Sequence, residues 1–358
     1  MRVRAVAQLA LLALIGAAAL ACPAPTDLAG PFVTDGAQAT DATTFQAVVE
    51  RLRAGHGYYE AMGEELRRHD YPTASSFNWR TPLHLQAVAA VPWGASRGVL
   101  TALLVALFAI TMASTQGERL VRWTAGTLQM GVLLLEAAPD AVYISEVWAG
   151  ALVGLSAGAF GLRHPMPAVA LGLGALFVRE LAAPYCVACT LIAIVQRQWR
   201  QCGAWLAGAG AYAAYYAWHA SQVAAHLTAS DIPASTGWLV FGGLPFLQSA
   251  VHKLGWLALL PGPFNAVAVV LLAAGIARAA APVHVRTGSA AFAGFFLVAG
   301  QPFNDYWGWL AAPTWAMACG HGAAAVTEAV RIATGSPPIA PSSAPDAPAP
   351  DDIRSSRC

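Results

Sequence analysis

The apolar residues of this chain are gathered in blocks of membrane-crossing length. A helix that crosses a bilayer needs about 20 mostly apolar residues, each adding 1.5 Å of rise. Such blocks lie at 5–22, 98–113, 123–137, 147–161, 168–178, 186–195, 204–218, 256–276, 290–299 and 310–326. They predict an all-α polytopic membrane protein with about ten transmembrane helices. A piece around 238–247 is expected to be interfacial or re-entrant.

The overall composition agrees with this prediction. Hydrophobic residues make up 57% of the 358 positions and charged residues 11%, against roughly 45–50% and 25% in soluble globular domains. The net charge is +1 and no long basic run is present, so the electrostatic pattern of a nucleic-acid-binding protein is missing. We therefore expect a membrane lipid partner and no nucleic acid.

The distribution of basic residues sets the expected orientation. Cytoplasmic loops carry an excess of Lys and Arg, and Arg2 and Arg4 therefore place the N-terminus in the cytoplasm. With the spans above, further arginines fall on that same side: Arg119, Arg122, Arg163, Arg197, Arg200, Arg278, Arg286 and Arg331. An even number of spans then leaves the C-terminus in the cytoplasm as well.

Four segments follow from this arrangement. Residues 1–22 are the first transmembrane helix, although their basic start and apolar run also fit a signal peptide. Residues 23–95 form a long external loop with short helices, and 96–332 form the transmembrane helical bundle. Residues 333–358, rich in Pro, Ala, Ser and Asp, are expected to be a disordered cytoplasmic tail, because they hold too little apolar surface to fold.

The external loop is the one polar segment large enough to build a site. Between 24 and 91 it contains the densest group of acidic residues in the chain, together with Tyr58, Tyr59, Tyr71 and Arg80. Apolar residues at helical spacing predict a helix over 41–53, which Gly55 and Gly57 would end.

A second set of polar residues falls at the outer ends of the spans. Ionisable groups near membrane depth are costly and usually face a cavity or one another. The set comprises Asp140, Glu146, Arg179, Glu180, His219, His226, Asn304, Asp305 and Tyr306. Arg179 and Glu180 interrupt an apolar stretch, which indicates an internal ion pair or an anionic ligand for the arginine.

These residue types favour sugar transfer from a lipid phosphate at the membrane surface. A carboxylate in the loop can take a proton from an acceptor hydroxyl, and the candidates are Asp35 and Asp41, with Glu50 further along the same helix. Arg80 and Arg179 could neutralise the leaving phosphate, because guanidinium groups pair well with phosphate oxygens.

Several motifs resemble one known family. They are Asp41-Ala-Thr-Thr-Phe45, Ala54-Gly-His-Gly-Tyr58-Tyr59, Asp70-Tyr71-Pro72, Trp79-Arg80-Thr81-Pro82-Leu83, Ser145-Glu146-Val147-Trp148, Val178-Arg179-Glu180-Leu181 and Asn304-Asp305-Tyr306-Trp307-Gly308. The pattern resembles bacterial membrane glycosyltransferases of the GT-C fold. More narrowly, it resembles a proteobacterial group of membrane proteins that act in cell-surface glycopolymer formation.

The resemblance implies a GT-C-like enzyme in the bacterial inner membrane. The expected donor is a polyprenyl-phosphate-linked sugar, the acceptor is a glycan on the periplasmic face, and the transfer is inverting. GT-C enzymes typically have a catalytic Asp or Glu in the first external loop, and Asp41 stands at that position here. Many members have adjacent acidic residues where this chain has Asp41-Ala42, so dependence on a divalent cation stays open and no metal ligand is assigned. No other cofactor is implied.

The remaining expected roles concern substrate binding. Arg80 and Arg179 would contact the donor phosphate, Glu180 would orient Arg179, and Asn304 to Trp307 would line the opposite wall. The full set of expected binding residues is Arg80, Arg179, Glu180, Glu146, Tyr58, Tyr59, Tyr71, Asn304, Asp305, Tyr306 and Trp307.

Two other functions fit the same composition. A transporter or flippase for lipid-linked sugars would share the outward arginines. It predicts inverted repeats and ionisable residues near the middle of the membrane, but the sequence shows neither, and its polar residues fall on one side. A non-catalytic subunit of a polysaccharide assembly complex predicts that Asp41 is dispensable.

Overall fold

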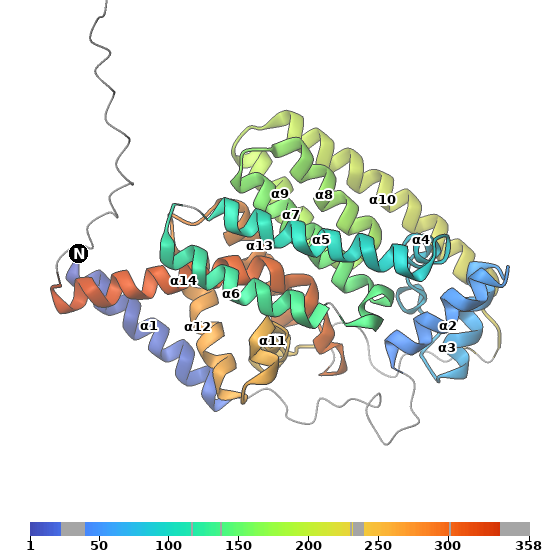
Figure 1. The fold of residues 1–358 in the computed structure, drawn as a ribbon, viewed down its shortest axis with the longest axis horizontal. Coiled ribbons are helices and arrows are strands. Elements are labelled where there is room, and N and C mark those ends of the chain that lie inside the picture. The colour runs from blue at the N-terminus through green and yellow to red at the C-terminus, as the bar shows by residue number, and fades with distance from the viewer. Residues whose placement is uncertain are drawn as a thin grey trace, which may run out of the picture.

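The computed structural model describes residues 1–22, 40–115, 117–136, 138–229, 231, 240–300 and 302–336. These residues form an all-α protein with fourteen α-helices (Figure 1). Five short 3-10 helices, written η, lie between some of them. No strand occurs in these ranges. Asp35 and most of the expected tail, 337–358, lie outside the described residues.

The α-helices have clear bounds in the chain. They are α1 Arg2–Ala21, α2 Asp41–Arg53, α3 Tyr58–Arg68, α4 Pro82–Ala89, α5 Trp93–Ser114, α6 Arg119–Glu136, α7 Ser145–Gly161, α8 Pro165–Val178, α9 Ala183–Val195, α10 Trp199–His226, α11 Gly243–His252, α12 Pro263–Ala277, α13 Val283–Val298 and α14 Gly308–Thr334. The 3-10 helices are η1 Ser76–Trp79, η2 Pro139–Tyr143, η3 Glu180–Ala182, η4 Gly255–Leu259 and η5 Pro302–Trp307.

Two helices are long and apolar enough to cross a membrane. They are α1, with a mean hydropathy of 2.0, and α5, with 1.8. Four shorter apolar segments accompany them, at Pro165–Val178, Glu180–Val195, Pro263–Ala277 and Val283–Val298. Within the described ranges the finding is thus two candidate spans, and the expected total of about ten stays a prediction.

One expected span is wrong in its bounds. The apolar block 256–276 does not form one helix, because η4 ends at Leu259 and α12 begins only at Pro263. Proline lacks the amide donor that a helix interior needs, but its fixed φ suits the first helical turn. Pro261 and Pro263 therefore separate the block into two elements.

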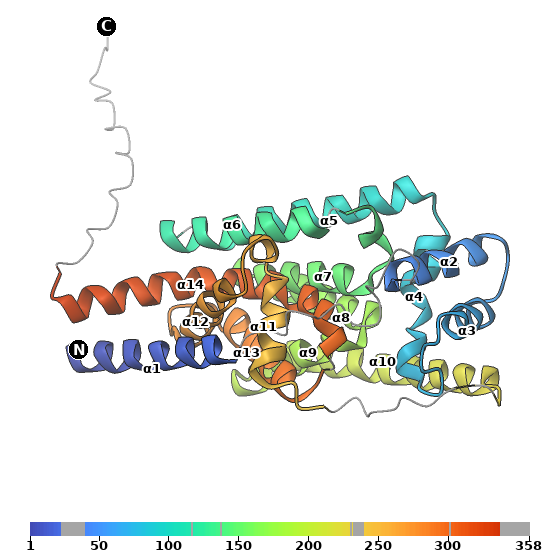
Figure 2. The ribbon, with the colours of Figure 1, turned by 90° about the horizontal axis from the view of Figure 1, so that it is seen from below.

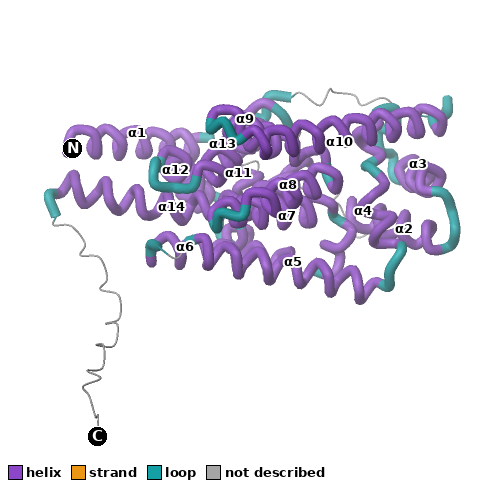
Figure 3. The backbone as a smooth tube through the Cα atoms, turned by 90° about the horizontal axis from the view of Figure 1, so that it is seen from above, coloured by secondary structure: helices purple, strands orange, loops and turns teal. Residues whose placement is uncertain are grey.

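The long helices lie side by side along the longest axis of the molecule (Figures 2 and 3). Helices α2, α3 and α4 gather at one end of this bundle, and the N-terminus lies at the other. The 28-residue helix α10 reaches past the bundle and contacts both α3 and η1. It thereby connects the bundle to the cap formed by α2, α3 and α4.

Helix α14 is the centre of the bundle and packs against α6, α12, α7 and α1. Its neighbours come close because glycines stand at the crossings: a Cβ atom on Gly322 would lie 1.8 Å from the carbonyl oxygen of Leu271, and one on Gly275 would lie 1.9 Å from that of Ala318. Small residues at such crossings let two helix backbones approach closely. Any larger side chain would force the helices apart.

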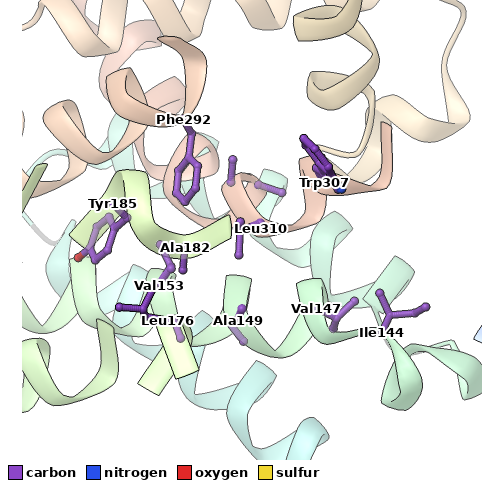
Figure 4. Packing of buried hydrophobic residues seen from close by; sticks show 14 of the residues in the cluster. Ile144, Val147, Ala149, Val153, Leu176, Ala182, Tyr185, Phe292, Trp307 and Leu310 are labelled. Carbon is purple, nitrogen blue, oxygen red and sulfur yellow. The ribbon is translucent and has the colours of Figure 1, made fainter. Parts of the chain in front are cut away.

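A buried apolar layer lies where the helices of the bundle meet. Val147 and Val153 of α7, Tyr185 of α9, Phe292 of α13 and Leu310 of α14 all belong to it (Figure 4). Each side chain is almost completely inaccessible to water. This layer holds the starts of α7 and α14 in place. The polar residues described below lie next to these two helix starts.

Helix α2 matches the helix expected over 41–53. Thr40 caps its start, since its hydroxyl oxygen accepts from the Thr43 amide and the Thr43 hydroxyl oxygen accepts from the Thr40 amide. This reciprocal pairing satisfies two of the free amides at a helix start. Phe45 and Val48 are buried beneath it. The positive φ of Gly55, 94°, then turns the chain toward α3.

Candidate functional site

A chain of buried ion pairs joins the cap to the bundle. Glu146, in the first turn of α7, lies between two arginines: its Oε1 is 3.3 Å from Nη1 of Arg80 and 2.7 Å from Nε of Arg179. Arg179 follows α8 and also pairs with Glu180, the first residue of η3. The side chains of Glu146 and Arg179 are only 1% and 5% exposed, so this chain of charges is shielded from water.

Arg80 owes its position to an unusual backbone turn. Its φ is +53°, a left-handed conformation that residues other than glycine seldom adopt. The hydroxyl of Tyr58 donates to the carbonyls of Trp79, at 3.0 Å, and of Arg80, at 3.1 Å. The guanidinium lies over the ring of Phe45, 5.2 Å from its centroid. These contacts hold the turn and direct Arg80 into the site.

The charge of Arg80 is secured by its neighbours. Burial alone would lower the pKa of Arg80, but the carboxylate of Glu146, the phenol of Tyr306 and the carboxylate of Asp41 raise it well above its ordinary value. Nη2 of Arg80 also donates to the hydroxyl of Tyr306 at 3.1 Å. In addition, Nε of Arg80 is buried without a hydrogen-bond partner, which leaves one donor of a permanent cation unused.

Asp41 stands at the outer end of this chain of charges. Its Oδ2 lies 3.5 Å from Nη2 of Arg80, and its Oδ1 accepts a hydrogen bond from the hydroxyl of Tyr71. Burial and the adjacent Asp41 raise the pKa of Tyr71 above its ordinary value, so Tyr71 keeps the proton that it donates. Asp41 is also the first residue of α2, where the helix dipole stabilises a carboxylate.

An apolar cavity of about 820 Å³ opens beside Arg179 and Glu180. Helices α8, α9, α10 and α13 line it, and most of the side chains in its wall are apolar. A second cavity, of about 570 Å³, lies between α9 and α13 and shares Pro184, Val187 and Leu191 with the first. The two cavities therefore follow α9 away from the ion pairs.

The structure brings together most of the residues that the sequence singled out. Seven of them belong to one network of contacts: Asp41, Tyr71, Arg80, Glu146, Arg179, Glu180 and Tyr306. The network joins residues from the expected external loop to residues from the expected outer ends of the spans. Their catalytic and binding roles stay predictions.

The other expected site residues lie around this network. Tyr58 supports the turn at Arg80, and the hydroxyl of Tyr59 lies 3.0 Å from Nδ1 of His219. Trp307 lines the larger cavity and stacks on Phe295.

Two residues of η5 behave differently from the rest of the expected wall. Asp305 does not face the network but pairs with Lys253 at 2.6 Å. Asn304 is buried, and its amide nitrogen has no hydrogen-bond partner. Asp35 lies outside the described residues, which leaves Asp41 as the placed candidate for the base.

The arrangement of charges bears on metal binding. In the described part of the chain, no three side chains of His, Cys, Asp or Glu converge as metal ligands. Asp41 and Glu146 are each paired with Arg80, so the arginine occupies the position between these two carboxylates.

The contribution of α10 to the cavity was not predicted. Tyr212 and Tyr216 line the larger cavity, and so does Phe77 of η1. A spacing of four residues between the two tyrosines places them on one face of a helix, and this pattern could have marked them in advance.

No protein-family model, no curated protein and no solved structure matches this chain. The ion-pair network and the adjoining cavities are therefore the structural basis for a functional proposal.

Proposed function

We propose that this chain is a polytopic membrane glycosyltransferase that moves a sugar from a polyprenyl phosphate to a glycan acceptor, with inversion, on the periplasmic face of a bacterial inner membrane. The main support is the unbroken chain of contacts from Asp41 through Arg80 and Glu146 to Arg179. Since Arg179 lies in the wall of the apolar cavity, these contacts connect Asp41 to the cavity. A proton acceptor, two cations and an apolar slot thus belong to one site.

The cavities fit a lipid chain. A lipid phosphate needs an apolar path for its tail and a cation at the end of that path for its head. The two cavities follow α9, and the exposed side chains of Val187 and Leu191 border both. A tail lying along α9 would place its phosphate beside Arg179.

The chemistry assigns a role to each end of the network. Asp41 takes the proton of the acceptor hydroxyl as its oxygen attacks the anomeric carbon. The bond from that carbon to the phosphate oxygen breaks, a glycosidic bond forms on the opposite face of the sugar, and the phosphate leaves with the electron pair. Arg179 and Arg80 stabilise the charge that develops on the phosphate.

A membrane setting is supported by α1 and α5, the two candidate spans. Large apolar side chains also stand exposed on several other helices, including Leu134, Val195 and Val267, and such surfaces are stable in lipid. The cap formed by α2, α3 and α4 would then lie on the outer side, with Arg2 in the cytoplasm.

The central experiment is the substitution Asp41→Asn. The matched control is Asp140→Asn, because Asp140 is an exposed aspartate expected on the same side of the membrane. We expect Asp41→Asn to abolish the surface glycan while its level in the membrane stays normal, and Asp140→Asn to leave the glycan intact. A normal glycan in the Asp41→Asn strain would reject Asp41 as the base and favour a non-catalytic subunit.

Sugar transfer by the purified protein separates an enzyme from a transporter. The full chain would be incubated in detergent with a synthetic polyprenyl phosphoryl sugar and an acceptor extract, and the released lipid phosphate would be measured. Release that depends on Asp41 supports the enzyme. Movement of the lipid-linked sugar across vesicle membranes without any release would instead identify a flippase.

The orientation can be tested by labelling single cysteines. Ala74, which lies between α3 and η1, and Ser336, which follows α14, are both exposed. In a variant with all six native cysteines replaced, an impermeant thiol reagent added to intact spheroplasts should label Ala74→Cys but not Ser336→Cys. Equal labelling would overturn the proposed orientation.

A further inference from the structure

One wall of the larger cavity is aromatic. Trp205, Ala209, Tyr212 and Tyr216 of α10 line the cavity, and their spacing of four, three and four residues puts them on one face of the helix. Phe77 of η1 completes this wall, since its ring centroid lies 5.5 Å from that of Tyr216. The wall thus begins with a tryptophan deep in the bundle and ends with two phenols and Phe77 near the cap.

The outer end of this wall also carries polar groups. The hydroxyl of Tyr212 is buried without a hydrogen-bond partner, while that of Tyr216 lies 3.0 Å from Oγ of Ser76. Glu180 lines the same cavity and is close enough to act electrostatically on both phenols. Arg179, which is paired with Glu180, completes the polar end.

Such a surface matches the two faces of a sugar. A pyranose ring has an apolar face of C–H groups, which packs on aromatic rings, and a rim of hydroxyls, which need hydrogen-bond partners. A carboxylate accepts hydrogen bonds but donates none, and a phenol does both. The buried hydroxyl of Tyr212, which now lacks a partner, would gain one from a bound sugar.

We infer that Phe77, Tyr212, Tyr216 and Glu180 form the binding site for the sugar ring of the lipid-linked donor, and that this sugar carries no carboxylate. This inference rests on the proposed function. The lining of the cavity supports it: Ala209 belongs to its apolar part, Arg179 is the proposed place for the phosphate, and Tyr216 lies at the end of the wall next to Ser76 and Phe77 of η1. A uronic acid would bring a second negative charge next to Glu180, and like charges in a shielded site repel.

Two probes separate recognition of the sugar from recognition of the lipid phosphate. They are farnesyl phosphate and farnesyl phosphoryl glucose, whose affinities for the purified full chain in detergent would be measured by displacement of radiolabelled farnesyl phosphate. The variants are Tyr212→Phe, which removes only the hydroxyl, and Phe77→Ala, which removes one ring of the wall. The control is Trp218→Leu, because Trp218 is a half-exposed aromatic residue of α10 that does not line the cavity.

We expect each of the two variants to weaken binding of the glucose-bearing probe roughly fivefold and to leave the Kd of farnesyl phosphate unchanged. Trp218→Leu should change neither affinity. Farnesyl phosphoryl glucuronic acid should bind the unsubstituted chain at least roughly tenfold more weakly than the glucose probe. Equal binding of these two sugars would overturn the assignment of the sugar class.

Two further outcomes would reject the inference for different reasons. Equal weakening of both farnesyl ligands in the variants would show that the aromatic wall holds the lipid chain, and the proposed function would survive. If the unsubstituted chain bound neither farnesyl ligand, the proposed function itself would fail, and the sugar site would fail with it.

Discussion

The most demanding prediction concerns Glu146, because one carboxylate serves two buried guanidinium groups. In the substitution Glu146→Gln the side chain keeps its shape but loses its charge. Its Oε1 lies 2.7 Å from Nε of Arg179 and 3.3 Å from Nη1 of Arg80. Removing one partner of a buried ion pair costs about 3–5 kcal/mol, since the remaining charge stays buried without compensation. Glu180 and Asp41 still offset part of the two positive charges, so we expect a loss of about 3 kcal/mol in the free energy of unfolding.

Glu118→Gln is the matched control. Glu118 also holds an arginine, with 2.7 Å between its Oε2 and Nη2 of Arg278, but its side chain is 43% exposed. Exposed pairs contribute at most about 1 kcal/mol. In thermal unfolding of the purified protein in detergent, Glu146→Gln should lower the melting temperature by roughly 4 °C, and Glu118→Gln by less than roughly 1.5 °C. Equal shifts in the two variants would refute the view that the pairs at Glu146 hold the cap and the bundle together.

Three further predictions address other parts of the chain. Burial lowers the pKa of His84 to about 4, so this residue stays neutral in the folded state at pH values where the unfolded chain would protonate it. The free energy of unfolding should therefore fall by up to about 3 kcal/mol as the pH drops from 6.5 to 4. Urea unfolding curves over this pH range would contradict this if the free energy of unfolding of His84→Gln changed with pH as steeply as that of the unsubstituted chain. Gly322→Ala places a Cβ atom 1.8 Å from the carbonyl oxygen of Leu271, whereas Gly294→Ala meets nothing within 4 Å. The first substitution should lower the free energy of unfolding by more than about 3 kcal/mol, and the second should leave it unchanged or raise it slightly. Similar melting temperatures of the two variants would argue against close packing of α12 on α14. Tyr71→Phe removes the donor to Asp41 and should reduce the rate of sugar transfer roughly tenfold with little change in donor affinity, so that a purely weaker donor affinity would place Tyr71 in binding instead.

The local features of this fold could be predicted from the sequence. Helix α2 has the bounds that the spacing of its apolar residues indicated, because that spacing and its caps act over only a few residues. The ion pair at Arg179 and Glu180 was also expected, since a charged pair inside an apolar stretch has few other ways to exist. Signals of this kind depend on neighbouring residues alone.

The contacts between distant segments could not be predicted. The pairing of Arg80 with Glu146 joins residues 66 positions apart. It depends on a left-handed turn at Arg80, and no glycine in the sequence predicts that turn. The pairing of Asp305 with Lys253 was missed for a similar reason: the sequence placed Asp305 beside Tyr306 on one wall, but η5 turns the two side chains toward different partners. Directions of this kind follow from packing of the whole bundle.

The length of α10 has a consequence for where the reaction would occur relative to the lipid. Its 28 residues span about 42 Å at 1.5 Å each, about 12 Å more than the hydrocarbon layer of a typical bilayer. With Trp199 at the inner boundary, Tyr212 and Tyr216 would stand about 20 and 25 Å above it, which is about 10 and 5 Å below the outer boundary. A sugar at that depth would be partly withdrawn from water, so the arginines would act on its phosphate through a weakly polarisable medium. An acceptor would have to dip below the headgroup plane to meet it, which favours a slender, flexible glycan chain end over a bulky folded substrate.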